Sequence, residues 1–282
     1  MRVNAGNTSK AVAALLLIVW SLLPVYQMLA LSLMPSDETF AGTFWPRNPT
    51  LGNFGVVLGQ DHFFLRHFWL QLGNSVFVGV ATSLLVLVLA SLASFSISRL
   101  RPGWGQRLSG LAMVSYLVPS AFLCIPLYKL MGKLGLLNSR WALILSLTAF
   151  SAPYAVWILC RYSRSIPPEL DDAARLDGAG AVQLFRLVYL PLMRPGLVAI
   201  GVHALLVAWN EYLYAFMLLS SETRMTVPVM LGYFLVTDDA PWNLLMATSI
   251  IYALPPVAIY YAARHHMTAG LAFSGDRAGG RP

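Results

Sequence analysis

Long apolar runs separated by shorter polar stretches dominate this sequence. Each run has about the 20 residues that an α-helix needs to cross a bilayer. Five runs carry no charged residue, and the sixth contains one acid, Glu211. The pattern predicts six membrane-spanning helices. The first is interpreted as a retained anchor because it is too long for a signal peptide, and the alternative is processing near Ala30. The runs cover Ala11–Met34, Asn74–Ser98, Leu108–Tyr128, Trp141–Cys160, Gly196–Leu219 and Trp242–Ala263.

The composition favours the same class of protein. Apolar residues make up 57% of the 282 residues and charged residues 11%, against roughly 45–50% and 25% in soluble domains. Such a chain could not cover a soluble surface, and it is too apolar to be disordered. Despite the net charge of +7, its charged residues are too few to build a face for nucleic acid. We therefore expect a lipid bilayer, and no nucleic acid, as a partner.

The positions of the basic residues predict the orientation in the membrane. With a cytoplasmic N-terminus, 13 of the 19 Lys and Arg residues fall in cytoplasmic segments and 6 in outer ones. Cytoplasmic loops typically carry such an excess, so both termini are predicted to be cytoplasmic. The Gly- and Arg-rich end of the chain, Ser274–Pro282, is predicted to be disordered.

Small residues and prolines within these runs indicate where helices pack closely and where they can be kinked or broken. Ala90, Ser94 and Ser98 lie four apart and predict a close helix–helix contact. The prolines fit either broken helices along a translocation pathway or the general frequency of proline in membrane helices. These prolines are Pro24, Pro119, Pro126, Pro153, Pro255 and Pro256.

The cytoplasmic loop 161–195 carries the strongest signal for a site. Pro168 suits a helix start, acids follow in the first turns, and Gly178 suits a left-handed stop, so a helix of about three turns is predicted. Its apolar face is shallow, which favours a docking element over a loop that lies on the membrane surface. A second apolar stripe follows and is expected to end at Leu190–Pro191. The face comprises Leu170, Ala173 and Ala174, and the stripe comprises Ala181, Leu184, Phe185 and Val188.

The same loop resembles a family signature. Asp172-Ala173-Ala174, then Gly178 after three residues, then Val188-x-Leu190-Pro191 after nine more, are similar to E-A-A-x3-G-x9-I-x-L-P. That is the EAA motif of binding-protein-dependent ABC importer permeases, with Asp here for Glu and Val for Ile. Four other stretches resemble the second, maltose-transporter G-type permease of the carbohydrate-uptake branch. They are Ile125–Tyr128, Leu134–Asn138, Ser165–Leu170 and Ala208–Leu213.

The resemblance implies a fold and an organisation. The fold would be an all-α integral membrane protein of the type I ABC importer permease class, with six transmembrane helices and a cytoplasmic coupling helix. Residues 1–70 would hold the N-terminal tail, the first helix and an outer loop. Residues 71–264 would form the permease core, and residues 265–282 a cytoplasmic tail that is partly disordered.

The resemblance also implies a function. The chain would be a multi-pass permease subunit of the bacterial inner membrane, would form half of the pore of a sugar or polyol importer, and would not be an enzyme. Its partners would be two ATP-binding subunits, a paralogous permease and an extracytoplasmic sugar-binding protein. ATP and Mg²⁺ would be bound by the partner ATPase, with no cofactor in this chain. The outer loop Ser220–Trp242 would reach the binding protein, and the loop 165–191 would couple to the ATPase. The coupling residues would be Glu169, Asp171, Asp172, Ala173, Ala174, Arg175, Gly178, Leu190 and Pro191.

One acid, Glu211, lies inside the fifth predicted span. A charge at a helix centre costs about 2.5–3.5 kcal/mol on insertion scales, so water, a polar partner or a place near the outer rim must offset it. Either Glu211 lines the sugar pathway or an outer gate, or it pairs with a basic or amide group for assembly. The predicted pathway residues are His203, Trp209, Asn210, Glu211 and Tyr212.

Two other classes of protein fit less well. An ion-coupled secondary transporter using Glu211 would need several intramembrane ionisable groups, and only His203 accompanies it. A membrane enzyme is suggested by 177–181, which begin like the D-G-x-x-A-R motif of CDP-alcohol phosphotransferases. However, Val182 replaces the arginine and the later acids are missing. The sequence carries no metal-ligand cluster and no G-x-x-x-x-G-K-[ST] phosphate loop, so energy would come from another chain.

Overall fold

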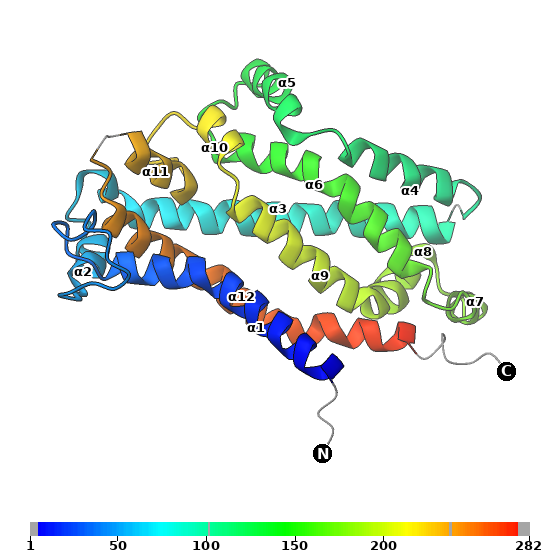
Figure 1. Ribbon diagram of the computed structural model, residues 1–282. Coiled ribbons are helices and arrows are strands. Elements are labelled where there is room, and N and C mark those ends of the chain that lie inside the picture. The colour runs from blue at the N-terminus through cyan, green and yellow to red at the C-terminus, as the bar shows by residue number, and fades with distance from the viewer. Residues whose placement is uncertain (1–4, 101, 237–238, 276–282) are drawn as a thin grey trace. The chain divides into compact units, whose positions relative to one another are not determined.

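The computed structural model describes residues 5–100, 102–236 and 239–275, and every element within these ranges is helical (Figure 1). Five stretches in these ranges are long and apolar enough to cross a membrane, or six if one bent pair is counted as a span. The α-helices are α1 (Ala5–Ser32), α2 (Gly52–Gly59), α3 (Phe68–Phe95), α4 (Pro102–Tyr116), α5 (Ser120–Lys133), α6 (Arg140–Ser163), α7 (Glu169–Leu176), α8 (Ala181–Gln183), α9 (Leu190–Trp209), α10 (Leu213–Leu218), α11 (Val227–Tyr233) and α12 (Trp242–Gly275). The 3₁₀ segments are η1 (Phe63–Leu65) and η4 (Phe234–Val236), and the π-helical segments are η2 (Ser96–Leu100) and η3 (Leu184–Tyr189).

The helix α1 agrees with a membrane anchor. Its apolar stretch Lys10–Ser32 is almost entirely exposed, and Trp20, for example, is 77% exposed. An apolar surface of this size is unstable in water but stable in lipid. The sequence-based prediction of a spanning helix in this region is therefore confirmed.

The contacts divide the chain into two compact units. The first unit comprises the chain up to Trp69 together with Met230–Leu254, and the second comprises Leu70–Val229 and the chain from Pro255 onward. The division expected from the sequence, at residues 70 and 264, stays a prediction.

Two asparagines hold the first unit together. The Asn53 side-chain amide donates to the Ser32 and Met34 carbonyls at 2.8 Å each, which ties α2 to the end of α1. Asn243, at the start of α12, donates to Asn53 Oδ1 at 3.0 Å. Both asparagines are buried. Buried amides that are satisfied in this way fix the path of the segment after the first span.

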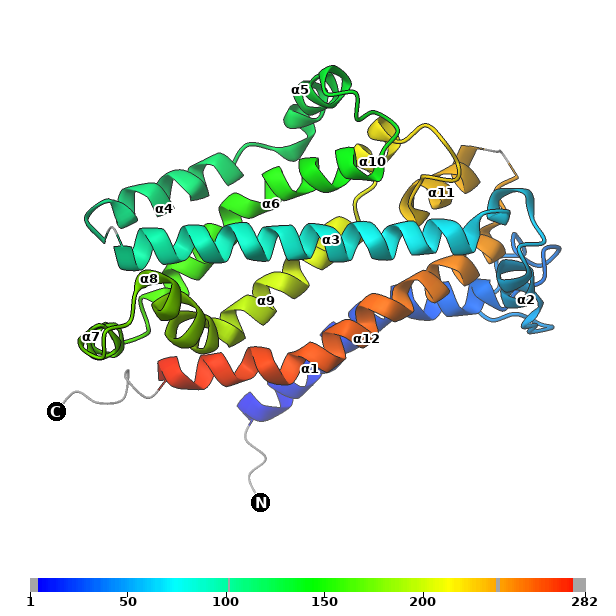
Figure 2. The ribbon, with the colours of Figure 1, turned by 180° about the vertical axis from the view of Figure 1, so that it is seen from behind.

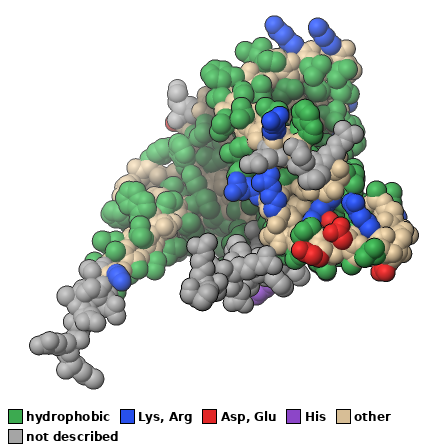
Figure 3. All heavy atoms as spheres, turned by 90° about the vertical axis from the view of Figure 1, so that its right-hand side faces the viewer, with side chains coloured by type: hydrophobic (Ala, Val, Ile, Leu, Met, Phe, Trp, Pro, Cys, Tyr) green, Lys and Arg blue, Asp and Glu red, His purple; other side chains and the backbone are tan. Residues whose placement is uncertain are grey.

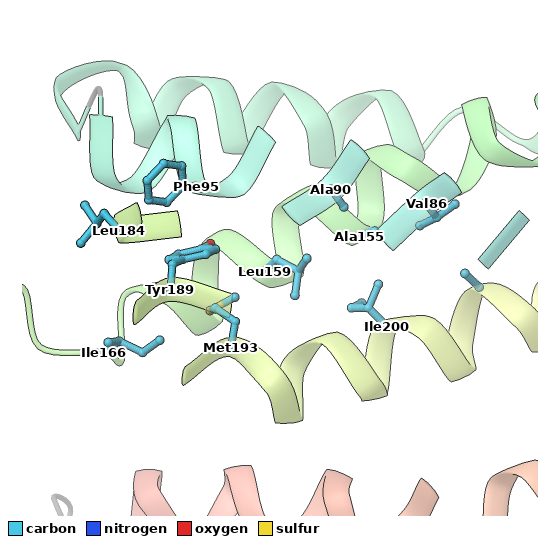
Figure 4. Close-up of a cluster of buried hydrophobic side chains, with 11 residues drawn as sticks. Val86, Ala90, Phe95, Ala155, Leu159, Ile166, Leu184, Tyr189, Met193 and Ile200 are labelled. Carbon is cyan, nitrogen blue, oxygen red and sulfur yellow. The ribbon is translucent and has the colours of Figure 1, made fainter. Parts of the chain in front are cut away.

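The core of the second unit lies where α3, α6 and α9 meet. A cluster of buried side chains is drawn from these helices, from η3 and from Ile166, and Tyr189 lies toward one end of it, near Phe95 and Met193 (Figure 4). Ala90 is fully buried there, and Ser94 Oγ lies 3.0 Å from the Tyr189 hydroxyl oxygen. The predicted close contact is thus confirmed at these two positions. Small side chains let the helix backbones approach closely, as is usual between helices in membranes.

Gly201 is a sensitive point of this packing. A Cβ there would lie 3.1 Å from Leu87 Cδ1, and Ser83 Oγ donates to the Gly201 carbonyl at 2.8 Å. We expect Gly201→Leu to overpack the α3–α9 contact and to lower stability by about 1–3 kcal/mol. The measurement is thermal unfolding of the detergent-solubilised chain. Gly73→Leu is the matched control because nothing lies within 4 Å of a Cβ at Gly73, and an equal loss in both variants would contradict this reasoning.

Two of the predicted spans are not continuous helices in the structure. The run Leu108–Tyr128 is broken, because α4 and α5 meet at an angle of 91° (Figure 1). Pro119 stands directly before α5 and has no N–H with which to continue α4. The run Gly196–Leu219 is also broken, because α9 ends at Trp209 and α10 begins only at Leu213.

The C-terminal prediction is corrected in part. The helix α12 continues to Gly275, so Ser274 and Gly275 are helical rather than disordered. The rest of the predicted disordered end, residues 276–282, lies outside the described residues.

Candidate functional site: a short helix clamped to the end of the bundle

The predicted docking helix exists as α7, although it is shorter than expected. It has eight residues, about two turns instead of three. Pro168 occupies the position before it and accepts hydrogen bonds from the Asp171 and Asp172 N–H groups. The acids Glu169, Asp171 and Asp172 fall in the first turn and Arg175 in the last, as the helix dipole favours.

Gly178 ends this helix in the predicted way. Its φ is +85°, the left-handed conformation that costs glycine least. The Ala179 N–H donates to the Ala174 carbonyl and the Gly178 N–H to the Arg175 carbonyl, both at 3.0 Å. This pair of bonds is the Schellman motif, which satisfies the last carbonyls of a helix. The prediction that α7 stops itself is therefore confirmed.

The faces of α7 have opposite roles. Ala174 packs against the buried cluster, and Asp171 is only 6% exposed. Two of the predicted coupling residues thus face the bundle, and of the predicted docking face only Leu170 and Ala173 are exposed. The other face is exposed, and at its end Leu176 is 89% exposed. Figure 3 shows acidic side chains gathered on this face with basic side chains next to them. The exposed members of α7 are Glu169, Leu170, Asp172, Ala173, Arg175 and Leu176.

Arg99 is the residue of this site that the sequence reasoning missed. Its Nε lies 3.1 Å from Asp171 Oδ2, and both side chains are 8% exposed. Its Nη2 donates to the carbonyls of Ser163 and Ile166 at 3.3 Å. The sequence identified Arg99 only as one more cytoplasmic basic residue. Asp171 lies three residues before Ala174 and so shares its face, but the sequence does not tell which face of α7 turns inward.

The chain from α7 into the membrane is continuous after Gly180. The Gly180 N–H donates to Gln183 Oε1 at 2.9 Å, and α8, η3 and α9 then form one apolar stretch, Ala181–Trp209. The expectation that Leu190–Pro191 ends the second stripe is therefore wrong. Pro191 lies in the first turn of α9, where its missing N–H is tolerated, directly after the wider π turn of η3.

Figure 2 shows α7 at the same end of the second unit as the last turn of α3 and the start of α9. The buried cluster continues to this end through Phe95 and Tyr189, whose ring centroids are 5.1 Å apart. The short helix is therefore attached directly to the core of the bundle.

The predicted pathway acid, Glu211, lies in the break between α9 and α10. The Tyr214 N–H donates to Glu211 Oε1 at 2.9 Å. This hydrogen bond from the first turn of α10 offsets part of the cost of burying the acid. Such satisfaction of a carboxylate by its own chain gives no support to an ion-coupled transporter.

The other predicted pathway residues occupy different environments. His203 lies against Tyr154 of α6 with ring centroids 4.9 Å apart, and Trp209 is buried at the end of α9. Asn210 is exposed and donates to the Leu206 carbonyl, and Tyr212 stacks on Phe216. The structure thus places Asn210, Glu211 and Tyr212 together in one break, and their role in a pathway stays a prediction.

Comparisons with known proteins agree with this geometry. Residues 54–271 match the family described as binding-protein-dependent transport system inner membrane component. The inner membrane ABC transporter permease protein YcjP of Escherichia coli is 32% identical over 265 residues, which cover 93% of each chain. The trehalose transport system permease protein SugB of Mycobacterium tuberculosis is 30% identical and covers 93% of this chain and 94% of its own. A chain of a bacterial ABC transporter that imports the acidic polysaccharide alginate has a similar fold, with a TM-score of 0.76 at 21% identity, and covers 92% of this chain and 95% of its own.

Proposed function

This chain belongs to the family of binding-protein-dependent transport system inner membrane components, and from this premise we propose how it couples ATP hydrolysis to uptake. It is a membrane-spanning permease subunit of an ABC importer, not an enzyme, and a separate ATPase chain hydrolyses the ATP. The helix α7 is the element that receives the motion of that ATPase.

The observation that carries this proposal is the two-sided character of α7. One side is fixed to the bundle through Asp171 and Ala174, and the other presents a shallow apolar line to the outside. That line consists of Leu170, Ala173 and Leu176, with Glu169 and Asp172 beside it. A groove on the ATPase can come close to such a face because it contains no bulky side chain at its middle, Ala173. The partner's motion is then passed to α9 through the continuous stretch Ala181–Trp209.

The names of related proteins suggest the substrate class. One relative is named for trehalose transport, and the chain with a similar fold belongs to an importer of a polysaccharide. We therefore infer a carbohydrate or polyol as the substrate class. It would cross the membrane between this chain and a second, paralogous permease, and an extracytoplasmic binding protein would deliver it.

The outer loop has a structure that suits contact with that binding protein. Asn74 donates to the Thr223 and Met225 carbonyls, at 3.0 and 2.9 Å, and Asn138 Oδ1 accepts from the Ser220 and Ser221 N–H groups. The start of the loop, 220–226, is thus held by side chains from two other segments. A loop held in this way keeps its shape when a partner docks.

Purification under mild conditions tests the assembly. Affinity purification of this chain from bacterial membranes should recover an ATPase and a second permease in fixed proportion. ATP hydrolysis by that complex should rise when the loaded binding protein is added. A mock purification from cells without the tagged chain is the control. Uptake by the isolated chain in liposomes without nucleotide would contradict the proposal.

A further inference from the structure

We propose that Arg99 is a positioning residue that ties α7 to the end of α3, so that the motion of the ATPase enters the membrane bundle at two places instead of one. The inference rests on the proposed function, because it takes α7 as the coupling helix. It adds a second route for the motion, through η2 into α3, to the covalent route through η3 into α9.

The contacts of one guanidinium carry this inference. Arg99 lies in η2, directly after α3, and its Nε forms an ion pair with Asp171 of α7 at 3.1 Å. The same side chain donates to the carbonyls of Ser163 and Ile166, which end α6 and lead to α7. Three segments therefore meet on a single planar group, and arginine suits this role because its donors form a rigid fork.

Burial distinguishes the Arg99–Asp171 ion pair from an ion pair on the surface. Arg99 and Asp171 are each only 8% exposed in their side chains, whereas the neighbouring acids Glu169 and Asp172 are exposed. If either partner is removed, the other is left as a buried, uncompensated charge, which is far more unfavourable than the loss of a surface pair. The pair therefore resists separation while α7 is pushed.

A helix of eight residues also needs outside attachment. So short a helix is marginal on its own, and its stability comes from packing. On one side, Ala174 packs against the buried cluster, and α7 lies against η3. On the same inward face, the Arg99–Asp171 pair attaches α7 to η2. With one attachment alone α7 could pivot, and with both its displacement must move α3 and α9 together.

The two attachment points share an unusual backbone. Both η2 and η3 are π-helical, and such turns are rare and frequent at functional sites. Aromatic side chains join the end of α3, directly before η2, to η3. The ring centroid of Phe95 lies 5.2 Å from that of Phe185 and 5.1 Å from that of Tyr189. A displacement of α7 would therefore act on two segments, the α3–η2 junction and η3, that are already connected by packed aromatic rings.

Double-mutant analysis of the reconstituted complex tests this inference. Arg99→Gln, Asp171→Asn and the double variant are incorporated into the complete importer, and uptake and ATP hydrolysis are measured in the same proteoliposomes. We expect each single variant to reduce the amount of substrate carried per ATP about tenfold, the size of effect that one coupling contact can carry. The double variant should regain thermal stability, because no unpaired charge remains, but it should stay as poorly coupled as the single variants.

Arg107→Gln is the matched control. It removes one positive charge from α4, eight residues further along the chain, but Arg107 is exposed and lies over the Trp104 ring instead of an acid. Its uptake per ATP should equal that of the unmodified importer. A double variant that regains both stability and coupling would overturn the inference, and so would loss of the assembled complex in all three variants, since the pair would then serve assembly alone. If the unmodified importer showed no link between ATP hydrolysis and uptake, the proposed function would fail instead.

Discussion

Replacing Gly178 with aspartate is expected to reduce ATP-dependent uptake to the background of cells that lack this chain, while the protein stays in the membrane. Gly178 ends α7 with φ +85°, and an L-residue in this conformation costs roughly 1–2 kcal/mol. The larger effect comes from the new charge, which would lie at the carboxyl end of α7, where the helix dipole disfavours anions. It would also project from the surface that we propose for the ATPase. Uptake of labelled substrate and the amount of chain in membranes are the measurements.

Gly135→Asp separates backbone strain from the coupling role. Gly135 also has a positive φ, +67°, and no atom lies within 4 Å of a Cβ at either glycine. The two substitutions therefore introduce the same side chain, with similar backbone strain and equal space, at two different loops. Uptake should persist in Gly135→Asp. If Gly178→Asp kept normal uptake, α7 would not be the coupling helix, and if both variants lost uptake equally, strain alone would explain the result.

Replacing Glu211 with glutamine is expected to reduce transport about tenfold or more while complex assembly stays close to normal. The reason is that glutamine keeps an acceptor oxygen for the Tyr214 N–H and so preserves the start of α10. The substitution removes only the charge from the break between α9 and α10. A tenfold change corresponds to about 1.4 kcal/mol, within the range of a single charge-assisted hydrogen bond. Uptake rates and the yield of intact complex are measured side by side.

Glu211→Ala provides the comparison for this prediction. Alanine removes the acceptor as well as the charge, so the Tyr214 N–H loses its partner and assembly should fall along with transport. If Glu211→Gln lost the complex but each remaining complex worked at the normal rate, Glu211 would be an assembly residue. That result would remove it from the predicted pathway.

The features that the sequence predicted correctly are local ones. Gly178 stops α7 because a left-handed residue is needed there, and the acids precede Arg175 because the dipole of the same helix favours that order. The regions of the spanning helices could be recognised because a membrane requires a minimum apolar length. Each of these requirements is satisfied within a few consecutive turns of the chain.

The breaks in two predicted spans show where such reasoning ends. Hydropathy alone gave one run across Pro119 and another across Glu211, because both stretches are apolar on average. Whether a proline kinks or divides a helix depends on which neighbours satisfy the freed backbone groups. At the second break, the Glu211 carboxylate accepts a hydrogen bond from the first turn of α10. The Tyr214 hydroxyl donates to the Ser120 carbonyl of α5, 94 residues earlier in the chain.

The sequence by itself determined that this is a helical membrane chain with a short, self-terminating helix in a loop between two apolar spans, because burial in lipid and helix capping act on neighbouring residues. Only the tertiary structure decided which acid of α7 turns inward and that Arg99 meets it. The two residues are 72 positions apart, and nothing local distinguishes Asp171 from Asp172 until the packing of Ala174 fixes the rotation of α7 about its axis.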